Sequence, residues 1–196
     1  MTILALPIKT DRLVLRAFSP NDLEAVMTYF TLPESRRYVD RGATDRAECA
    51  RALDAMCQEV ALNRPGETLS LAIERAEDQT LIGQVQLRWY DATAAQGELR
   101  FIIAPEYRGK GYATEAVSRV IDLAFGDLNI HRLFAKCDAR NMRSAKLMQR
   151  IGMRLEAHYR EHALFKGEWD EELHFALLDR EWRRSSKVHE LTHRVA

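Results

Sequence analysis

Residues 108–113 (RGKGYA) combine residue types that suit the binding of an anion. They follow an apolar run from Leu99 to Ala104, which reads as a buried strand, and they precede a segment with helical periodicity. The backbone N–H groups in the first turn of a helix have no intrahelical partner, and glycines keep side chains out of the way. The order of strand, glycine turn and helix therefore predicts an anion site where the helix begins.

The spacing of this turn excludes two common phosphate motifs. A nucleotide P-loop needs G-x-x-x-x-G-K-[ST], and a dinucleotide fold needs G-x-G-x-x-G with an acidic residue about twenty positions on. Neither pattern is present in this stretch. By itself the turn is equally compatible with a purely structural glycine turn ahead of a helix.

The elements around the turn can be read in order along the chain. Apolar residues after it recur every three or four positions, as in one packed face of a helix: Ala113, Ala116, Val117, Val120, Ile121 and Ala124. Alternation and capping signals predict the other elements. They are a strand at 10–17, helices at 19–30 and 45–62, strands at 68–75 and 80–90, the strand before the turn, a strand at 131–138, a helix at 141–150, and strands at 153–165 and 171–178.

This order predicts a single domain of the α/β (α+β) class. We expect a mixed, mostly antiparallel sheet of six to seven strands flanked by about four helices. The domain should span residues 1–182, and residues 183–196 should form a basic C-terminal tail or a short helix.

Composition excludes several classes of function. Lys plus Arg and Asp plus Glu both number 29, so a formal charge of zero gives no reason to expect nucleic acid as a partner. No apolar run is long enough for a membrane helix, and no basic region precedes the short apolar patch at the start, so we expect a cytoplasmic protein without a secretory signal. The three cysteines have no C-x-x-C spacing, which favours reduced thiols.

A zinc signature also occurs in the sequence. His158-x-x-Glu161-His162 matches the inverzincin pattern, which needs both histidines on one face of a helix. Met153, Leu155 and Ala157 alternate with polar residues, which indicates a strand, where two residues four positions apart are about 13 Å apart. We therefore expect no metal.

Four segments, in order, resemble the RimJ/RimL-like branch (ribosomal-protein N-acetyltransferases) of the GNAT superfamily of acetyl-CoA-dependent N-acetyltransferases. They are TDRLVLRAFSPNDLEAV, APEYRGKGYATEA, NMRSAKLMQRIGM and FKGEWDEELHFALLDREW, and together they span residues 10–182. The resemblance implies a GNAT-like domain with two strands splayed at the cofactor site.

The resemblance also implies roles for particular residues. The backbone of the glycine turn would hold the CoA pyrophosphate: Arg108, Gly109, Lys110, Gly111, Tyr112 and Ala113. The strand residues Phe101, Ile102 and Ile103 would offer backbone groups to the pantetheine amides. Asn141 matches the cofactor-contacting Asn of the family, and Ser144 matches a Ser near the thioester sulfur.

The chain departs from the family pattern at one catalytic position. Many GNAT enzymes carry a Tyr seven residues after the Asn as the general acid, whereas this chain has Met148, whose thioether cannot donate a proton. Ser144 then becomes the candidate proton donor, with a merely polar residue in a first helical turn as the alternative.

The amine must also lose a proton before it can attack. Glu98 resembles the position from which relatives present a Glu base; the alternative is a solvated strand end. Glu172 and Tyr159 are rival candidates for this role. Cys137 could be imagined as a covalent relay, but its place on an apolar strand face favours the core.

These residues suggest an N-acetyltransferase that moves an acetyl group from acetyl-CoA to a primary amine by direct attack in a ternary complex. The acceptor would be a protein N-terminal α-amine or a small-molecule amine, chosen by loops around Thr31 to Arg41 and Lys166 to Asp170. We expect no membrane partner and a monomer or homodimer. Two alternatives are a non-catalytic acyl-CoA-binding sensor, which Met148 permits, and a nucleotide phosphate-binding protein.

Overall fold

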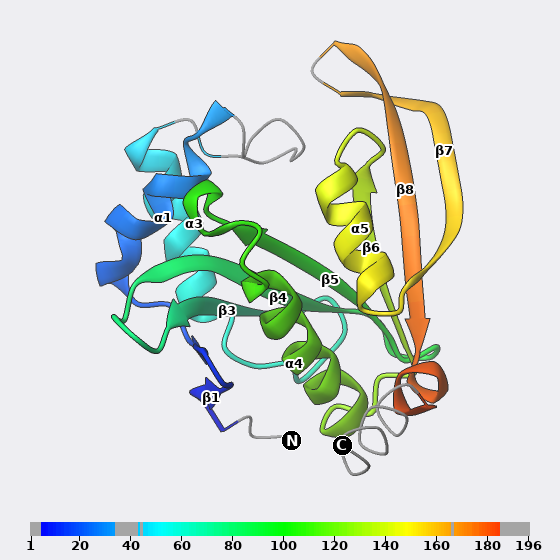
Figure 1. The fold of residues 1–196 in the computed structure, drawn as a ribbon, viewed down its shortest axis with the longest axis horizontal. Coiled ribbons are helices and arrows are strands. Elements are labelled where there is room, and N and C mark those ends of the chain that lie inside the picture. Colours follow the sequence, from blue (N-terminus) through cyan, green and yellow to red (C-terminus); the bar gives the residue numbers. More distant parts are fainter. Residues whose placement is uncertain (1–4, 34–42, 44, 166, 185–196) are drawn as a thin grey trace.

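The fold is one eight-stranded sheet with helices on both faces (Figure 1). It is known from a computed structural model that describes residues 5–33, 43, 45–165 and 167–184. The strands are β1 (Ile8–Lys9), β2 (Leu13–Arg16), β3 (Thr68–Arg75), β4 (Leu81–Asp91), β5 (Gln96–Ile103), β6 (Arg132–Asp138), β7 (Arg154–Phe165) and β8 (Glu168–Leu178). The helices are η1 (Pro20–Asp22), α1 (Leu23–Phe30), α3 (Arg46–Gln58), η2 (Pro105–Tyr107), α4 (Tyr112–Gly126) and α5 (Met142–Arg150).

The strands lie in the order β1-β2-β3-β4-β5-β6-β8-β7. Neighbouring strands are antiparallel except β5 and β6, which are parallel because α4 carries the chain back along the sheet between them. The predicted α/β class and mostly antiparallel sheet are thus confirmed. One edge strand, Ile8–Lys9, was not predicted; it pairs with Val14 and Leu15. Two residues are too few to show an alternation pattern in the sequence.

Each face of the sheet has its own hydrophobic core. On one face, here called the α4 face, the apolar sides of α4 and α5 pack against strand residues such as Leu71, Leu99 and Leu133. On the opposite α1 face, α1 and α3 pack against Ala72 and Ile102. The alternation of side chains along each strand assigns every strand residue to one of these faces.

The predicted element boundaries mostly agree with the structure. Helix α3 is shorter than predicted: it ends at Gln58, whereas the sequence pattern predicted an end at about Leu62. Most of the predicted loop from Thr31 to Thr44, together with Lys166 and the tail from residue 185 onward, lies outside the described residues. Residues 179–184 are helical. Within the described part of the chain, none of the helices combines the length and apolar character needed to span a membrane.

Candidate active site

The two parallel strands at the centre of the sheet part after a short contact. β5 and β6 pair only at Gln96 with Arg132, Gly97 with Leu133 and Glu98 with Phe134. Beyond these pairs β5 stays on β4 and β6 stays on β8, so the two halves of the sheet diverge (Figure 1). From residues 99 and 135 onward, the strand edges that face one another carry backbone groups without a ladder partner. Such edges can bind a ligand that has amides of its own.

The glycine turn lies at the open end of this gap. Gly109 and Gly111 have φ of +77° and +85°, a left-handed conformation that side-chain-bearing residues rarely adopt. The first backbone bond of α4 runs from the amide of Glu115 to the carbonyl oxygen of Gly111 (3.1 Å), so the amides of residues 112–114 precede the helical ladder. Arg108 Nε donates to the Ile103 carbonyl (2.9 Å), which fixes the turn to the end of β5.

The start of α5 lies at the same end of the gap. Because β5 and β6 are parallel, their carboxyl ends point the same way, toward the glycine turn and toward α5 respectively. Asn141 is the N-cap of α5, and its side-chain oxygen accepts a hydrogen bond from the Ser144 amide (3.2 Å). The structure therefore brings Asn141 and Ser144 together, and it gives Asn141 a capping role as well.

Glu98 lies at the closed end of the gap, at the last pair before the strands part. Its side chain is on the α1 face and is only 6% exposed, so it is not a solvated strand end. Both carboxylate oxygens accept hydrogen bonds from Arg100, from Nε at 3.1 Å and from Nη2 at 2.8 Å. The Arg100 side chain is 56% exposed and can leave the carboxylate without disturbing the core.

The chain is similar in sequence and in structure to known acetyltransferases. The acetyltransferase (GNAT) domain family matches residues 12–154. The chain belongs to this GNAT family. The uncharacterized N-acetyltransferase YnaD of Bacillus subtilis is 29% identical over 175 residues, which cover 89% of this chain and 98% of YnaD. A GNAT-family acetyltransferase from Bacillus anthracis superposes with a TM-score of 0.80 at 25% identity, covering 90% and 100% of the two chains. A candidate ribosomal-protein-serine acetyltransferase from Vibrio cholerae superposes with a TM-score of 0.76 at 25% identity, covering 88% and 97%.

Arg12 braces the glycine turn of this GNAT domain, a role that the sequence did not reveal. Its Nη1 donates to the Lys110 carbonyl (3.0 Å), and its Nε donates to Glu115 (2.7 Å). Burial alone would raise the pKa of Glu115, but hydrogen bonds from Thr10 and Arg12 outweigh it and hold that pKa below its ordinary value. The guanidinium also lies over the Tyr112 ring, 4.8 Å from its centroid. Arg12 thereby attaches the N-terminal segment to the turn at Lys110 and Tyr112 and to α4 at Glu115.

We predict that Arg12→Gln weakens CoA binding about fivefold, because one charge-assisted hydrogen bond to the turn is lost at a site half open to solvent. Isothermal titration with CoA measures this change. The control is Arg46→Gln, which should leave CoA affinity unchanged. Arg46 is an exposed arginine on α3, away from the turn, and its guanidinium lies 2.5 Å from the Glu24 carboxylate. Equal affinity of the Arg12 variant and the wild type would show that the brace does not shape the turn.

The rival candidates for the base lie on other strands of the α1 face. Glu172 Oε1 on β8 is 2.5 Å from His174 Nε2 and 3.8 Å from Lys136 Nζ. Tyr159 on β7 contacts the His174 ring, with 4.6 Å between ring centroids. In strand order these residues are separated from β5 by β6, whereas Glu98 is on β5 itself. The geometry therefore favours Glu98 as the base, because Glu172 and Tyr159 do not lie at the point where β5 and β6 part.

Cys137 packs in the core on the α4 face, a place that does not favour a nucleophile. Burial, together with the charges of Asp138 and Glu172, raises the pKa of the Cys137 thiol to about 12. We predict that Cys137→Ala keeps kcat within about twofold, because a thiol with a raised pKa stays protonated at neutral pH and does not attack a thioester. Steady-state kinetics at pH 7 to 8 measures this, and a large loss of kcat at full CoA affinity would reinstate the covalent relay.

The zinc signature does not form the helix that it requires. Arg154–Phe165 is a strand, as predicted, with a bulge that places Glu161 at φ +47°. His158 Nε2 lies 2.7 Å from Glu171 Oε2, and the His162 ring lies beside the Tyr159 ring. The two histidines thus have separate partners.

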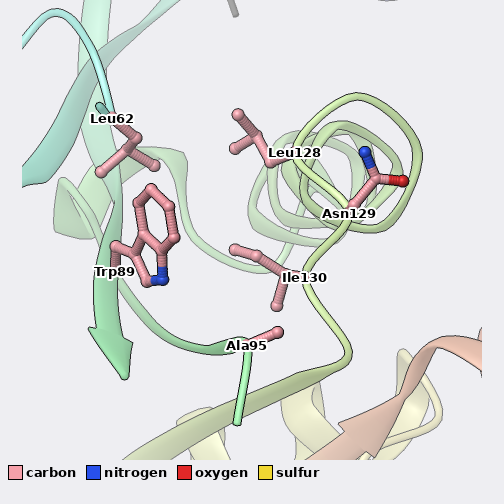
Figure 2. Close-up of a pocket in the computed structure, with 6 residues that line it drawn as sticks. All are labelled: Leu62, Trp89, Ala95, Leu128, Asn129 and Ile130. Atoms are coloured by element: carbon pink, nitrogen blue, oxygen red, sulfur yellow. The ribbon is translucent and has the colours of Figure 1, made fainter. Parts of the chain in front are cut away.

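A mainly apolar hollow is present at the end of α4 opposite the glycine turn (Figure 2). It is lined by Leu62, Trp89, Ala95, Leu128, Asn129 and Ile130. Leu62 lies between α3 and β3, Trp89 and Ala95 lie beside the amino end of β5, and the other three residues follow the C-terminus of α4, whereas the glycine turn is at the N-terminus of α4. The hollow is therefore separate from the candidate active site, and its lining has no ionisable side chain.

Proposed function

We propose that this GNAT protein transfers an acetyl group from acetyl-CoA to a primary amine by direct attack in a ternary complex. The observation that carries the proposal is the parting of β5 and β6 beside the glycine turn. A diphosphate needs convergent amides without side chains in the way, and the turn and the first turn of α4 supply them. The pantetheine arm of CoA contains two amides, which can pair with an open strand edge, and residues 99–103 supply such an edge.

Named residues would hold the acetyl-CoA. We assign the pyrophosphate to the backbone of residues 108–113, with Lys110 adding a positive charge, and the pantetheine to the backbone of Phe101, Ile102 and Ile103. Asn141 would contact the cofactor in addition to capping α5. Acetyl-CoA supplies an acetyl thioester, whose carbonyl can be attacked by an amine and whose thiolate can leave.

Glu98 is the residue that we propose as the base. An ammonium has no lone pair, so a carboxylate next to the acceptor must take a proton from it, directly or through a water molecule. The burial of Glu98 at the closed end of the gap suits this role. Arg100 is hydrogen-bonded to the Glu98 carboxylate in the structure. We infer that the ammonium of the acceptor takes the place of this guanidinium.

Ser144 is our candidate for the group that protonates the leaving thiolate. Its hydroxyl makes no hydrogen bond to any of the described residues, and it lies in the first turn of α5. Met148 is only 1% exposed and packs in the core on the α4 face. The position at which many relatives carry a Tyr acid is therefore used for packing here, which leaves the proton to Ser144 or to water.

We place the protein in the RimJ/RimL-like branch, with a protein N-terminus as the first acceptor to test and a small amine as the second. The four sequence segments and the likeness to the Vibrio cholerae structure support this placement. We expect a cytoplasmic monomer or homodimer, in line with the free thiols of Cys49, Cys57 and Cys137.

A thiol-release assay tests the proposal. Purified protein is mixed with acetyl-CoA, a thiol-trapping dye and a panel of amines. Release of CoA that requires both the protein and an amine supports acetyl transfer. Binding of acetyl-CoA without turnover on any amine would indicate a sensor instead. A thermal shift with ATP or GTP but none with CoA would indicate a nucleotide-binding protein.

A further inference from the structure

Arg88 lies next to the proposed base, on the same face of the sheet. It is on β4, and its Cα pairs with that of Glu98 across the β4–β5 ladder. Directly opposed residues on antiparallel strands point to the same face, with Cβ atoms about 5 Å apart. Arg88 is therefore a direct neighbour of the carboxylate at which the amine would lose its proton. Its side chain is only partly exposed.

The other charges on this part of the α1 face already have partners, including Glu59, whose carboxylate accepts hydrogen bonds from Ser70 and Gln86. Glu98 is held by Arg100 at 2.8 Å, and Arg132 contacts Glu156 at 2.5 Å. Lys136, farther along β6, has Glu172 at 3.8 Å. Arg88, in contrast, has no carboxylate partner among the residues that the structure describes. Glu98, the neighbour of Arg88 across the ladder, is bound by Arg100, so the Arg88 guanidinium can bind the carboxylate of a ligand.

The surroundings of Arg88 leave it able to bind such a ligand. Its guanidinium lies over the ring of Tyr90, 5.9 Å from the centroid. Tyr90 in turn contacts Phe134 edge to face, with 5.1 Å between ring centroids, and Phe134 is the partner of Glu98 on β6. A guanidinium that lies over a ring makes no hydrogen bond to it, so its N–H groups stay free to match the two oxygens of a carboxylate.

We infer that the acceptor carries a carboxylate within a few bonds of its amine and that Arg88 binds this carboxylate. The inference rests on the proposed acetyl transfer, with the amine at Glu98. Two sources share this chemistry: a free α-amino acid, through its main-chain carboxylate, and a peptide with an acidic first residue, through its side chain. A polyamine has no such group and would place a second cation beside Arg88.

Matched acceptors with a free or an amidated carboxylate test the inference, with rates compared per free amine, because amidation also lowers the pKa of an α-amine. One pair is alanine and alaninamide, and the other is Asp-Ala-amide and Asn-Ala-amide; spermidine is the polyamine. For wild type, kcat/KM should favour the carboxylate member of one pair by about 10- to 100-fold, the range expected of one charge-assisted hydrogen bond. The pair that shows the preference identifies the source.

In Arg88→Gln the same preference should fall to within about threefold, while the rate with the amide member stays near that of wild type. Arg88→Lys keeps the charge without the planar fork, so it should restore part of the preference. Arg51→Gln, which removes an exposed arginine on α3, is the control and should keep the full preference. Equal rates within both pairs, a preference for spermidine, or a preference that survives in Arg88→Gln would each overturn the inference.

A binding measurement decides the inference even without turnover. Protein saturated with CoA is titrated calorimetrically with N-acetylalanine, N-acetyl-Asp-Ala-amide and their carboxamide counterparts. Tighter binding of one carboxylate ligand by wild type, lost in Arg88→Gln, supports the inference. It does so even if no amine in the panel is acetylated, because a lack of acetylation would count against the proposed function and not against the binding of a carboxylate by Arg88. Equal binding of acid and amide ligands by wild type would overturn the inference while acetyl transfer could still be observed.

Discussion

Gly111→Glu is expected to abolish CoA binding, with a loss of affinity of at least about 100-fold, because it puts a carboxylate where two phosphates would meet the backbone amides. The domain should remain folded. The left-handed conformation of Gly111 costs a side-chain-bearing residue about 1 kcal/mol, a small part of the stability of a domain. A Cβ at this position would lie 3.2 Å from Arg12 Nη2, the flexible end of a side chain that can move. Calorimetry with CoA and thermal unfolding measure the two effects separately.

Gly66→Glu is the matched control for this prediction. Gly66 has φ of +91° with nothing within 4 Å of an added Cβ, so it has the same kind of backbone strain and receives the same charge. Its amide donates to the Trp89 carbonyl, at the far end of β4 and β5 from the glycine turn. This variant should lose similar stability and keep CoA binding. If Gly111→Glu bound CoA as wild type does, the turn would not be the pyrophosphate site.

Local patterns in the sequence predicted the elements well, because each strand or helix buries one regular face. The predicted packed face of α4 is an example: Ala116, Val117, Val120 and Ile121 are at most 1% exposed. The parting of β5 and β6 could not be predicted in this way. Alternation shows that a strand is half buried but not how far it stays paired, and the splay entered only through the resemblance to GNAT proteins.

The charge pairs around the site also could not be predicted from the sequence. Arg12 and Glu115 are 103 positions apart, and their contact depends on where β2 lies relative to the start of α4. Arg88 and Glu98 are neighbours only because of the β4–β5 register. The burial of Glu98 was equally hidden, since a strand end is solvated or buried according to what packs over it. Such contacts depend on tertiary structure, which one sequence does not specify residue by residue.

Glu98→Gln is expected to lower kcat by about 100-fold near neutral pH, within the range that general acid–base catalysis contributes. Gln is similar in size to Glu and can still accept a hydrogen bond from Arg100, so folding and CoA affinity should be retained. The deficit should be largest near and below pH 7, where the amine is almost fully protonated, and should shrink as pH rises toward the pKa of the amine and free amine becomes available without a base. Rates of CoA release from pH 6 to 9, with saturating acetyl-CoA, measure the profile.

Glu172→Gln separates this role from a general effect of charge on the α1 face. Glu172 is a partly exposed carboxylate on the same face that contacts His174 and Lys136, and its loss removes the same unit of charge. In the strand order β6 lies between Glu172 and β5. A charge at that distance is screened by salt and changes the activation barrier of acetyl transfer little. We therefore expect this variant to keep kcat within about threefold and to keep the wild-type pH profile. A wild-type profile for Glu98→Gln together with a steep loss for Glu172→Gln would instead make the Glu172–His174 pair the base. The acceptor would then bind over β6 and β8, and Glu98 would serve only to hold Arg100 at the point where the strands part.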